Sequence, residues 1–168
     1  MQKMLILLVS ALMLLGVAGA ETSRADDVEF EEILAGDFGL SYDGPTDLVI
    51  RNERQWCEFW EQAHGVRTEP PPCDLSVVDF RHEAVIASAF AGSNGCISID
   101  ITHIEARHGR GDLSVFTRDT VPGRSCLCTL SFVFPVHAVV VSKPVGRVSF
   151  IHDTATLQCG PVVIDLPR

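Results

Sequence analysis

Two cysteines separated by a single residue, Cys126 and Cys128, are the first candidates for chemistry in this sequence. In an extended segment, residues i and i+2 face the same side, so the two sulfur atoms project together. Such a pair could hold a metal ion or carry out redox chemistry. Alternatively, the two cysteines form disulfides with two different partners, such as Cys96 and Cys159. The Cys-X-Cys spacing is not that of the common zinc knuckles, which favours the disulfide interpretation.

The whole cysteine set supports the same interpretation. An even number of cysteines behind a secretory signal predicts disulfides, and the six candidates here are Cys57, Cys73, Cys96, Cys126, Cys128 and Cys159. Their pairing does not follow from the sequence. For one pair, Cys57 and Cys73, we predict a bridge that ties a proline-rich loop to the flank of a helix. Three disulfides at roughly 2–4 kcal/mol each would stabilise a domain of this size substantially.

The other residues form no recognisable catalytic arrangement. The sequence has six histidines, at positions 64, 82, 103, 108, 137 and 152, and no two of them have the helical spacing of a zinc protease. His103 and His108 are weak ligand candidates, whereas His137 is expected to be packed or hydrogen-bonded. No GxSxG, GxxxxGK[ST] or GxGxxG motif is present. We therefore predict a protein that is not an enzyme, with no catalytic, cofactor-binding or metal-binding residues.

The N-terminus has the three parts of a secretory signal. Lys3 supplies a positive charge, residues 4–17 are an apolar run, and Ala18-Gly19-Ala20 is a small-residue cleavage site. We predict that residues 1–20 are a signal peptide and that the protein is extracytoplasmic, either periplasmic or secreted. An uncleaved anchor is the alternative, but the run is short for a span of about 20 residues. No membrane span is expected after cleavage.

The chain is acidic, with a formal net charge of −9, and removal of Lys3 with the signal would give −9 − 1 = −10. A nucleic-acid partner is not expected, because nothing here would neutralise phosphates. Nine acids and a single base, Arg24, lie between residues 21 and 47. We interpret residues 21–46 as an acidic leader, disordered at 21–27 and with a first strand beginning near residue 28. Residues 47–168 are then the main domain.

The stretch from Asn52 to Gly65 has a strong helical pattern. Asn52 can cap the N-terminus, Gln55 stands where a capping box would reach back, and Gly65 can end the helix. The apolar residues recur at i, i+3, i+4 and i+7 and so share one face: Trp56, Phe59, Trp60 and Ala63. We expect this face to pack on a sheet, with an aromatic binding surface as the alternative.

The sequence after the helix is typical of β-structure. Residues 84–91 are apolar on both faces, which indicates a central strand, and residues 96–107 are expected to be the longest strand. Pro135 is expected to end a strand, because proline cannot donate to a ladder. Further strands are predicted at 47–51, 113–118, 130–134, 138–141 and 148–151, and residues 77–80 are expected to be a short strand or an extended segment. The predicted class is α+β: a mainly antiparallel β-sheet with one helix packed across it, stabilised by disulfides.

The order of several short motifs resembles the C-terminal domain of the PrcB family, the protease complex subunit PrcB. The motifs are Trp56-x-x-Phe59-Trp60, Val78-Asp79-Phe80, Ala84-Val85-Ile86-Ala87, Gly92 before Ile97-x-Ile99-x-Ile101, and Pro135 to Lys143 as a closing strand. The similarity spans about residues 47–143. It implies an exported, non-enzymatic domain, which in the namesake is an accessory subunit that associates with and stabilises a cell-surface subtilisin-like protease. It supplies no catalytic residues to carry over.

These observations favour an exported interaction module with a protein partner, which the resemblance suggests is a protease. Two other classes of function remain as alternatives. One is a secreted enzyme or metal-binding protein that uses the cysteines and histidines. The other is a protease inhibitor, with an exposed loop such as Thr68 to Cys73 entering an active site.

Overall fold

The computed structural model describes residues 25–37, 45–64, 72–90, 95–107 and 111–160. The predicted signal peptide at 1–20 and the helix-ending Gly65 lie outside these ranges.

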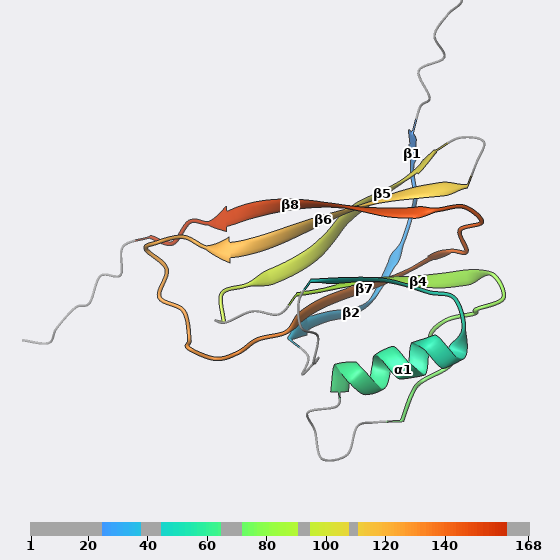
Figure 1. The fold of residues 1–168 in the computed structure, drawn as a ribbon, viewed down its shortest axis with the longest axis horizontal. Coiled ribbons are helices and arrows are strands. Elements are labelled where there is room, and N and C mark those ends of the chain that lie inside the picture. The colour runs from blue at the N-terminus through green and yellow to red at the C-terminus, as the bar shows by residue number, and fades with distance from the viewer. Residues whose placement is uncertain (1–24, 38–44, 65–71, 91–94, 108–110, 161–168) are drawn as a thin grey trace, which may run out of the picture.

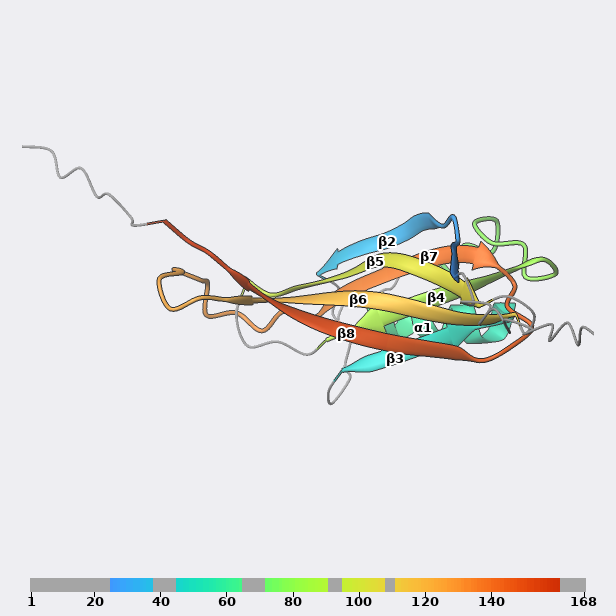
Figure 2. The same ribbon diagram turned by 90° about the horizontal axis from the view of Figure 1, so that it is seen from above.

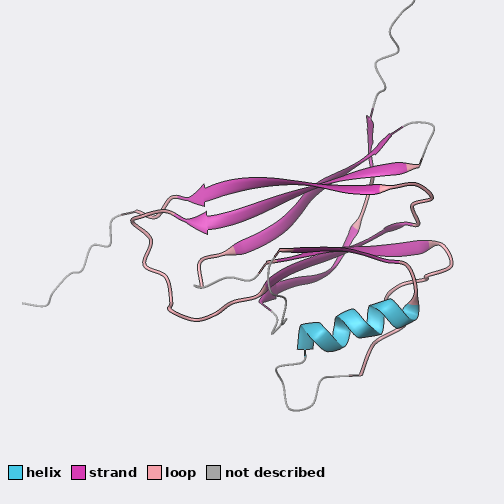
Figure 3. Cartoon of the chain, viewed as in Figure 1, coloured by secondary structure: helices cyan, strands magenta, loops and turns pink. Residues whose placement is uncertain are grey.

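Two four-stranded β-sheets stack on each other, and the helix covers the outer face of one of them (Figures 1 and 3). The first sheet has the strand order β1-β5-β6-β8 and the second has the order β2-β7-β4-β3. The strands are β1 (Ala25–Asp27), β2 (Glu31–Asp37), β3 (Thr46–Ile50), β4 (Glu83–Ala89), β5 (Ser98–Arg107), β6 (Asp112–Pro122), β7 (Pro135–Ser142) and β8 (Val148–Leu157), and the helix is α1 (Glu53–His64). The pairing of β6 with β8 is parallel, and the others given for the described strands are antiparallel. The predicted α+β class is confirmed.

The central strands β4 and β7 are buried on both faces, as the apolar run at 84–91 predicts. Alternate residues of a strand face opposite sides. Val85, Ala87, Ala89, Val136, Ala138 and Val140 accordingly pack under the helix, whereas Ile86, Val139 and Val141 pack between the two sheets. The second sheet therefore separates two cores, one shared with the helix and one shared with the first sheet.

Helix α1 begins as its sequence predicts. The side-chain Oδ1 of Asn52 accepts the N–H of Gln55 at 2.9 Å, which is the expected N-cap. Oε1 of Gln55 reaches back to the N–H of Arg51 at 2.9 Å, one residue before the cap rather than to the cap itself. Two backbone N–H groups at the start of the helix, those of Arg51 and Gln55, thereby gain side-chain acceptors that the helix itself does not supply.

The predicted inner face of α1 is core, as expected. Trp56, Phe59 and Ala63 are each at most 2 % exposed, and Trp60 is half-buried beside them. The ring centroids of Trp56 and Phe59 are 5.7 Å apart, within the range of favourable aromatic pairs. Burying each of these large side chains contributes roughly 1.5–3 kcal/mol, so this face holds the helix on the sheet.

A β-bulge interrupts the alternation predicted for β5. Ile99 and Ile101 are buried, but the register shifts between Ile101 and His103, so that Ile104 is the next buried residue. The extra residue is Thr102, which is exposed. The prediction that this strand is the longest is wrong, since β6 has 11 residues and β5 has 10. β6 extends to Pro122 because β8 pairs with it as far as Leu157.

Two local predictions are also wrong. Residues 25–27, expected to be disordered, form β1, because the free edge of β5 supplies backbone partners from Glu105 to Arg107. Residues 77–80, expected to be extended, contain turns instead. There the carboxylate of Asp79 accepts the N–H of Arg81 at 3.1 Å, and this local bond favours a turn over a strand.

Candidate functional site

Residues 123–134 connect β6 to β7 and extend beyond the ends of β6 and β8 (Figures 1 and 2). We call this segment the tip loop. Its two cysteines pair separately, as Cys126–Cys159 and Cys96–Cys128. The prediction that Cys126 and Cys128 are bridged to two different partners is confirmed. All six cysteines are in disulfides, so none is available as a thiolate ligand or as a dithiol.

The prediction of a strand at residues 130–134 is wrong. The segment is a loop with a single bridge residue, Val133, and β7 begins at Pro135 rather than a strand ending there. The first position of a strand suits proline because its missing N–H costs no ladder bond. Leu130 and Phe132 alternate like one face of a strand, but they lie in solvent, with 99 % and 79 % of their surface exposed.

Leu127 is the third large apolar side chain exposed on the tip loop, at 79 %. The loop contains no acidic residue and one base, Arg124, in a chain whose net charge is −9. Soluble proteins seldom leave several large apolar side chains together in solvent unless the surface meets a partner. The tip loop is therefore the candidate functional site.

No sequence pattern marks all three of these residues as exposed. A signal for one of them is present, because two bridged cysteines facing the body require the residue between them, Leu127, to face away.

Backbone contacts also hold the tip loop. The N–H of Gly123 donates to the carbonyl of Leu157 at 3.1 Å, and the N–H of Gly95 donates to the carbonyl of Thr129 at 3.1 Å. A Cβ added at Gly123 would lie 2.8 Å from the carbonyl oxygen of Leu157, so this close approach requires glycine. Hydrogen bonds and disulfides thus hold the loop between residues 123 and 129, although Leu127, Leu130 and Phe132 are not buried.

The predicted Cys57–Cys73 bridge is present and ties the helix flank to the segment that follows the proline-rich loop. The same segment is held by Trp56, whose indole Nε1 donates to the carbonyl of Asp74 at 2.9 Å. Of the loop suggested for protease inhibition, Thr68 to Cys73, residues 68–71 lie outside the described residues. Its last residue, Cys73, is fixed against the helix and packs on the core.

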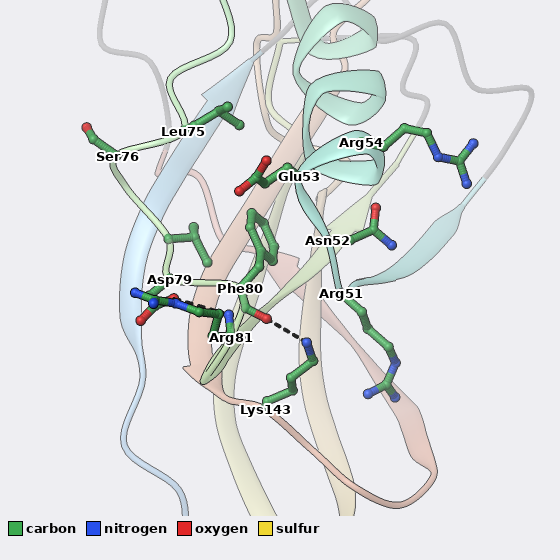
Figure 4. A pocket seen from close by; sticks show the side chains of 11 residues that line it. Arg51, Asn52, Glu53, Arg54, Leu75, Ser76, Asp79, Phe80, Arg81 and Lys143 are labelled. Carbon is green, nitrogen blue, oxygen red and sulfur yellow. Dashed lines mark hydrogen bonds and ion pairs between the residues drawn. The ribbon is translucent and has the colours of Figure 1, made fainter.

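A cleft of about 750 Å³ lies between the start of α1 and residues 75–81 (Figure 4). Of its four basic side chains, Arg54 and Arg81 pair with the carboxylates of Glu58 and Asp79, and the other two donate to backbone carbonyls of neighbouring segments. Nη1 of Arg51 donates to Pro144 at 2.8 Å, and Nζ of Lys143 donates to Phe80 at 2.6 Å. These contacts join the helix, the 75–81 segment and the end of β7, so we assign the cleft a structural role.

Asp79 is the carboxylate at the centre of the turn beside that cleft. Its Oδ2 lies 2.9 Å from Nδ1 of His82, and its Oδ1 accepts Nε of Arg81 at 3.0 Å. The hydrogen bond with His82, followed by those with Arg81, holds the pKa of Asp79 well below its usual range. Asp79 is therefore a fixed acceptor and not a proton donor near neutral pH.

His137 joins the two sheets from inside. It is 5 % exposed, and its Nδ1 accepts the N–H of Ile101 at 2.6 Å, at the bulge of β5. A ring nitrogen that accepts carries no proton, so the proton is on Nε2, which donates to Oε2 of Glu32 at 3.0 Å. The expectation of a packed, hydrogen-bonded histidine is confirmed, and both ring nitrogens are used structurally.

His152 joins the two sheets at one edge, where β8 and β3 lie side by side (Figure 2). Its Nε2 is 3.0 Å from Oδ2 of Asp47 on β3, and its Nδ1 is 3.2 Å from Oδ2 of Asp119 on β6. Partial burial alone would lower the pKa of His152. The hydrogen bond and charge of Asp47, together with those of Asp119, outweigh burial and raise the pKa above its ordinary value.

Ser88 lies near this cluster without forming a catalytic triad. A triad requires the serine hydroxyl to bond the imidazole, which in turn bonds the carboxylate. Here the hydroxyl of Ser88 donates to Oδ1 of Asp47, on the opposite side of the carboxylate from His152. Asp47 therefore separates the serine from the histidine, and the histidine is poised between two carboxylates as an ion pair.

The remaining described histidines have local partners. Nδ1 of His64 contacts the carbonyl of Trp60 at 2.9 Å, and the ring of His103 stacks on Phe116 at 4.0 Å. His108 lies outside the described residues. Within the described part of the chain, no group of three or more His, Cys, Asp or Glu side chains is placed to hold a metal ion.

Compared with known proteins, the chain matches no protein-family model, no curated protein and no solved structure. Within the described residues, no helix has the length and apolar character needed to cross a membrane. The three disulfides are compatible with an oxidising environment.

Proposed function

We propose that this protein is an exported, non-enzymatic interaction module and that its partner is an extracytoplasmic protease. The observation that carries the proposal is the tip loop, on which Leu127, Leu130 and Phe132 stand in solvent while two disulfides hold the backbone. Apolar surface of this kind gains free energy when a partner covers it. A loop that is ordered before binding also loses little conformational entropy on binding.

The charge distribution also supports the tip loop as the surface that contacts the partner. The chain carries a net charge of −9, whereas the tip loop has one arginine and no acid. The centre of a protein interface is depleted in charged residues and enriched in aromatic ones, and its rim is polar. Phe132 with Leu130 fits such a centre, and the acidic body would remain at the rim or outside it.

The proposal that the partner is a protease rests on the resemblance to the PrcB family. Four of the five motifs that carry it fall mainly in α1, β4, β5 and β7, which belong to the helix-covered sheet and its neighbour. The fifth, Val78-Asp79-Phe80, lies in the turn segment before β4. The tip loop lies between the β5 and β7 motifs and provides the exposed surface. In this proposal, the family-like body positions the loop. The predicted signal at 1–20 and the disulfides support a location outside the cytoplasm.

Protease inhibition is the second candidate function, because Leu127 stands exposed between two cysteines that are each bridged to the body. A metal-binding function that uses the cysteines is not proposed, since all six are in disulfides.

The test is capture from the extracytoplasmic fraction of the host. The captured proteins are released from the support under non-denaturing conditions, and the serine hydrolases among them are then identified by an activity-based fluorophosphonate label. We expect the immobilised wild-type protein to capture a labelled protease, and the double variant Leu130→Asp, Phe132→Asp to capture at least about tenfold less, as for a hot spot. The control is Val145→Asp, at a side chain that is 90 % exposed in the β7–β8 connection. Equal capture by the double variant, or capture of no protease, would contradict the proposal.

A further inference from the structure

The segment Cys126-Leu127-Cys128 presents one apolar side chain outward from an anchored backbone. Cys126 and Cys128 are half-buried and bridged to the body, whereas Leu127 between them is 79 % exposed. This alternation is that of an extended chain. The segment contains no helix, strand or turn residue. A single large side chain thus projects between two anchored positions, with the alternation of burial expected of the extended form in which proteases bind substrates.

The two sides of the Leu127–Cys128 peptide bond are tied to the body independently. Cys126 is bridged to Cys159, beyond the end of β8, and Cys128 is bridged to Cys96, just before β5. On the second side, the carbonyl of Thr129 also accepts the N–H of Gly95 at 3.1 Å. Cleavage of this bond would leave both new chain ends attached to the protein and close to each other.

The backbone of this segment is open to pairing. Among the described residues, no backbone hydrogen bond uses the N–H of Leu127 or of Cys128. Free donors on an extended chain can pair with the edge of another protein's strand, and alternate side chains then enter its pockets. The flanking residues Leu130 and Phe132 could contact the rim of such a cleft.

We propose that Cys126 to Thr129 is a substrate-like reactive loop that enters the cleft of a serine protease, with Leu127 filling an apolar specificity pocket. This inference rests on the proposed function and names its binding mode. It makes the protein an inhibitor of proteases that cleave after large apolar residues. A hydrophobic pocket beside the catalytic serine provides that specificity.

The covalent step explains why such a loop would inhibit rather than be consumed. The serine oxygen of the protease bonds to the carbonyl carbon of Leu127, the Leu127–Cys128 peptide bond breaks, and the serine proton passes through the protease histidine to the amine of Cys128. The Cys96–Cys128 disulfide keeps that amine beside the ester, where it can attack and re-form the peptide bond. Hydrolysis by water, which would leave a carboxylate on Leu127, therefore competes poorly.

The experiment measures inhibition constants of the disulfide-bonded mature protein against chymotrypsin and subtilisin, whose pockets are apolar, and trypsin, whose pocket ends in a carboxylate. We expect inhibition of chymotrypsin, subtilisin or both. Leu127→Lys should weaken this inhibition by at least about 30-fold, the loss of a hot spot, and create inhibition of trypsin. The matched control, Val145→Lys, changes a side chain that is 90 % exposed in the β7–β8 connection, outside the tip loop, and should neither weaken the inhibition nor create inhibition of trypsin.

Two results would contradict the reactive-loop proposal. One is that the wild-type protein inhibits neither chymotrypsin nor subtilisin, and the other is that the two lysine variants change the inhibition constants equally. Disulfide mapping of each variant shows that the loop is still closed. Mass spectrometry after long incubation should find cleavage between Leu127 and Cys128, and cleavage elsewhere in the loop also counts against the proposal. A protein that captures a partner through Leu130 and Phe132 but inhibits no protease refutes the reactive loop and leaves the interaction module standing.

Discussion

The helix-covered face and the tip loop use the same kinds of residue in opposite ways. Helix α1 and most of the tip loop lie outside the strand pairings, each is cross-linked by at least one disulfide, and each carries large apolar side chains. On the helix, Trp56 and Phe59 are at most 2 % exposed. On the tip loop, Leu130 and Phe132 are at least 79 % exposed. The helix face adds to the core, whereas the tip loop adds to the surface.

The difference shows what a disulfide contributes in each setting. Cys57–Cys73 reinforces a segment that apolar packing already holds, because both cysteines contact the core under the helix. At the tip, two disulfides order a loop that has little packing of its own. Cross-links that replace a core leave apolar side chains free for a partner. Variants in the two regions should therefore differ in whether they change folding stability or binding.

The largest expected loss of stability is that of Trp56→Ala on the helix-covered face. Removing this fully buried side chain should lower the free energy of unfolding by about 3–5 kcal/mol, because it leaves a cavity and removes the bond to the Asp74 carbonyl. Urea denaturation followed by tryptophan fluorescence of Trp60 measures it. Trp56→Phe keeps much of the packing and loses the indole donor, so it should cost clearly less. A loss below about 1 kcal/mol for the alanine variant would show that the face is not core.

The next largest loss of stability is expected when the Cys57–Cys73 bridge is removed by replacing both cysteines with serine. The cysteines are 16 residues apart, and closing a loop of that length stabilises by about 3 kcal/mol through the entropy of the unfolded chain. Denaturation of the double variant and the wild type under non-reducing conditions gives this difference. Capture of the proposed protease partner by the folded variant should be unchanged, because the tip loop keeps both of its disulfides. Loss of capture in a folded sample would mean that the two regions are not independent.

A smaller, pH-dependent effect is expected at His152, which joins the edges of the two sheets. Its pKa is raised in the folded protein, so its ion pairs contribute fully below the unfolded pKa of about 6.5 and are lost as pH rises through the folded pKa. His152→Gln should therefore cost about 1 kcal/mol near pH 6 and less near pH 9. NMR titration of the imidazole checks the direction of the pKa shift. A cost that grows with pH would contradict the assignment.

The sequence predicted the helix-covered face better than the tip loop, for a physical reason. Trp56, Phe59 and Ala63 recur with the period of a helix, and one N-cap fixes where it starts, so local pattern and burial agree. Leu130 and Phe132 have the period of a strand, but periodicity does not say whether a face meets another layer. The pairing of Cys126 and Cys128 with residues about 30 positions away decides that, and such pairing is not encoded locally.

Neither the bulge in β5 nor the cluster of charged side chains around His152 could be predicted from the local sequence, for a similar reason. Asp47 and His152 are 105 residues apart, and they meet because β3 and β8 are edges of different sheets. The sequence indicates strands in both places without indicating two stacked sheets. Strand periodicity therefore predicted the class of the fold, whereas long-range pairing set the layers.

The smallest expected change in stability, and the sharpest test of the comparison, is Phe132→Ser on the tip loop. Because 79 % of this side chain is already exposed, the free energy of unfolding should change by less than about 0.5 kcal/mol. Capture of the proposed protease partner should nevertheless fall, since the apolar contact at the proposed interface is lost. Denaturation and capture are measured on the same preparation, with Val145→Ser as the exposed control. If Phe132→Ser destabilises the fold by as much as 2 kcal/mol, then Phe132 is part of a core, and the distinction between the two regions fails.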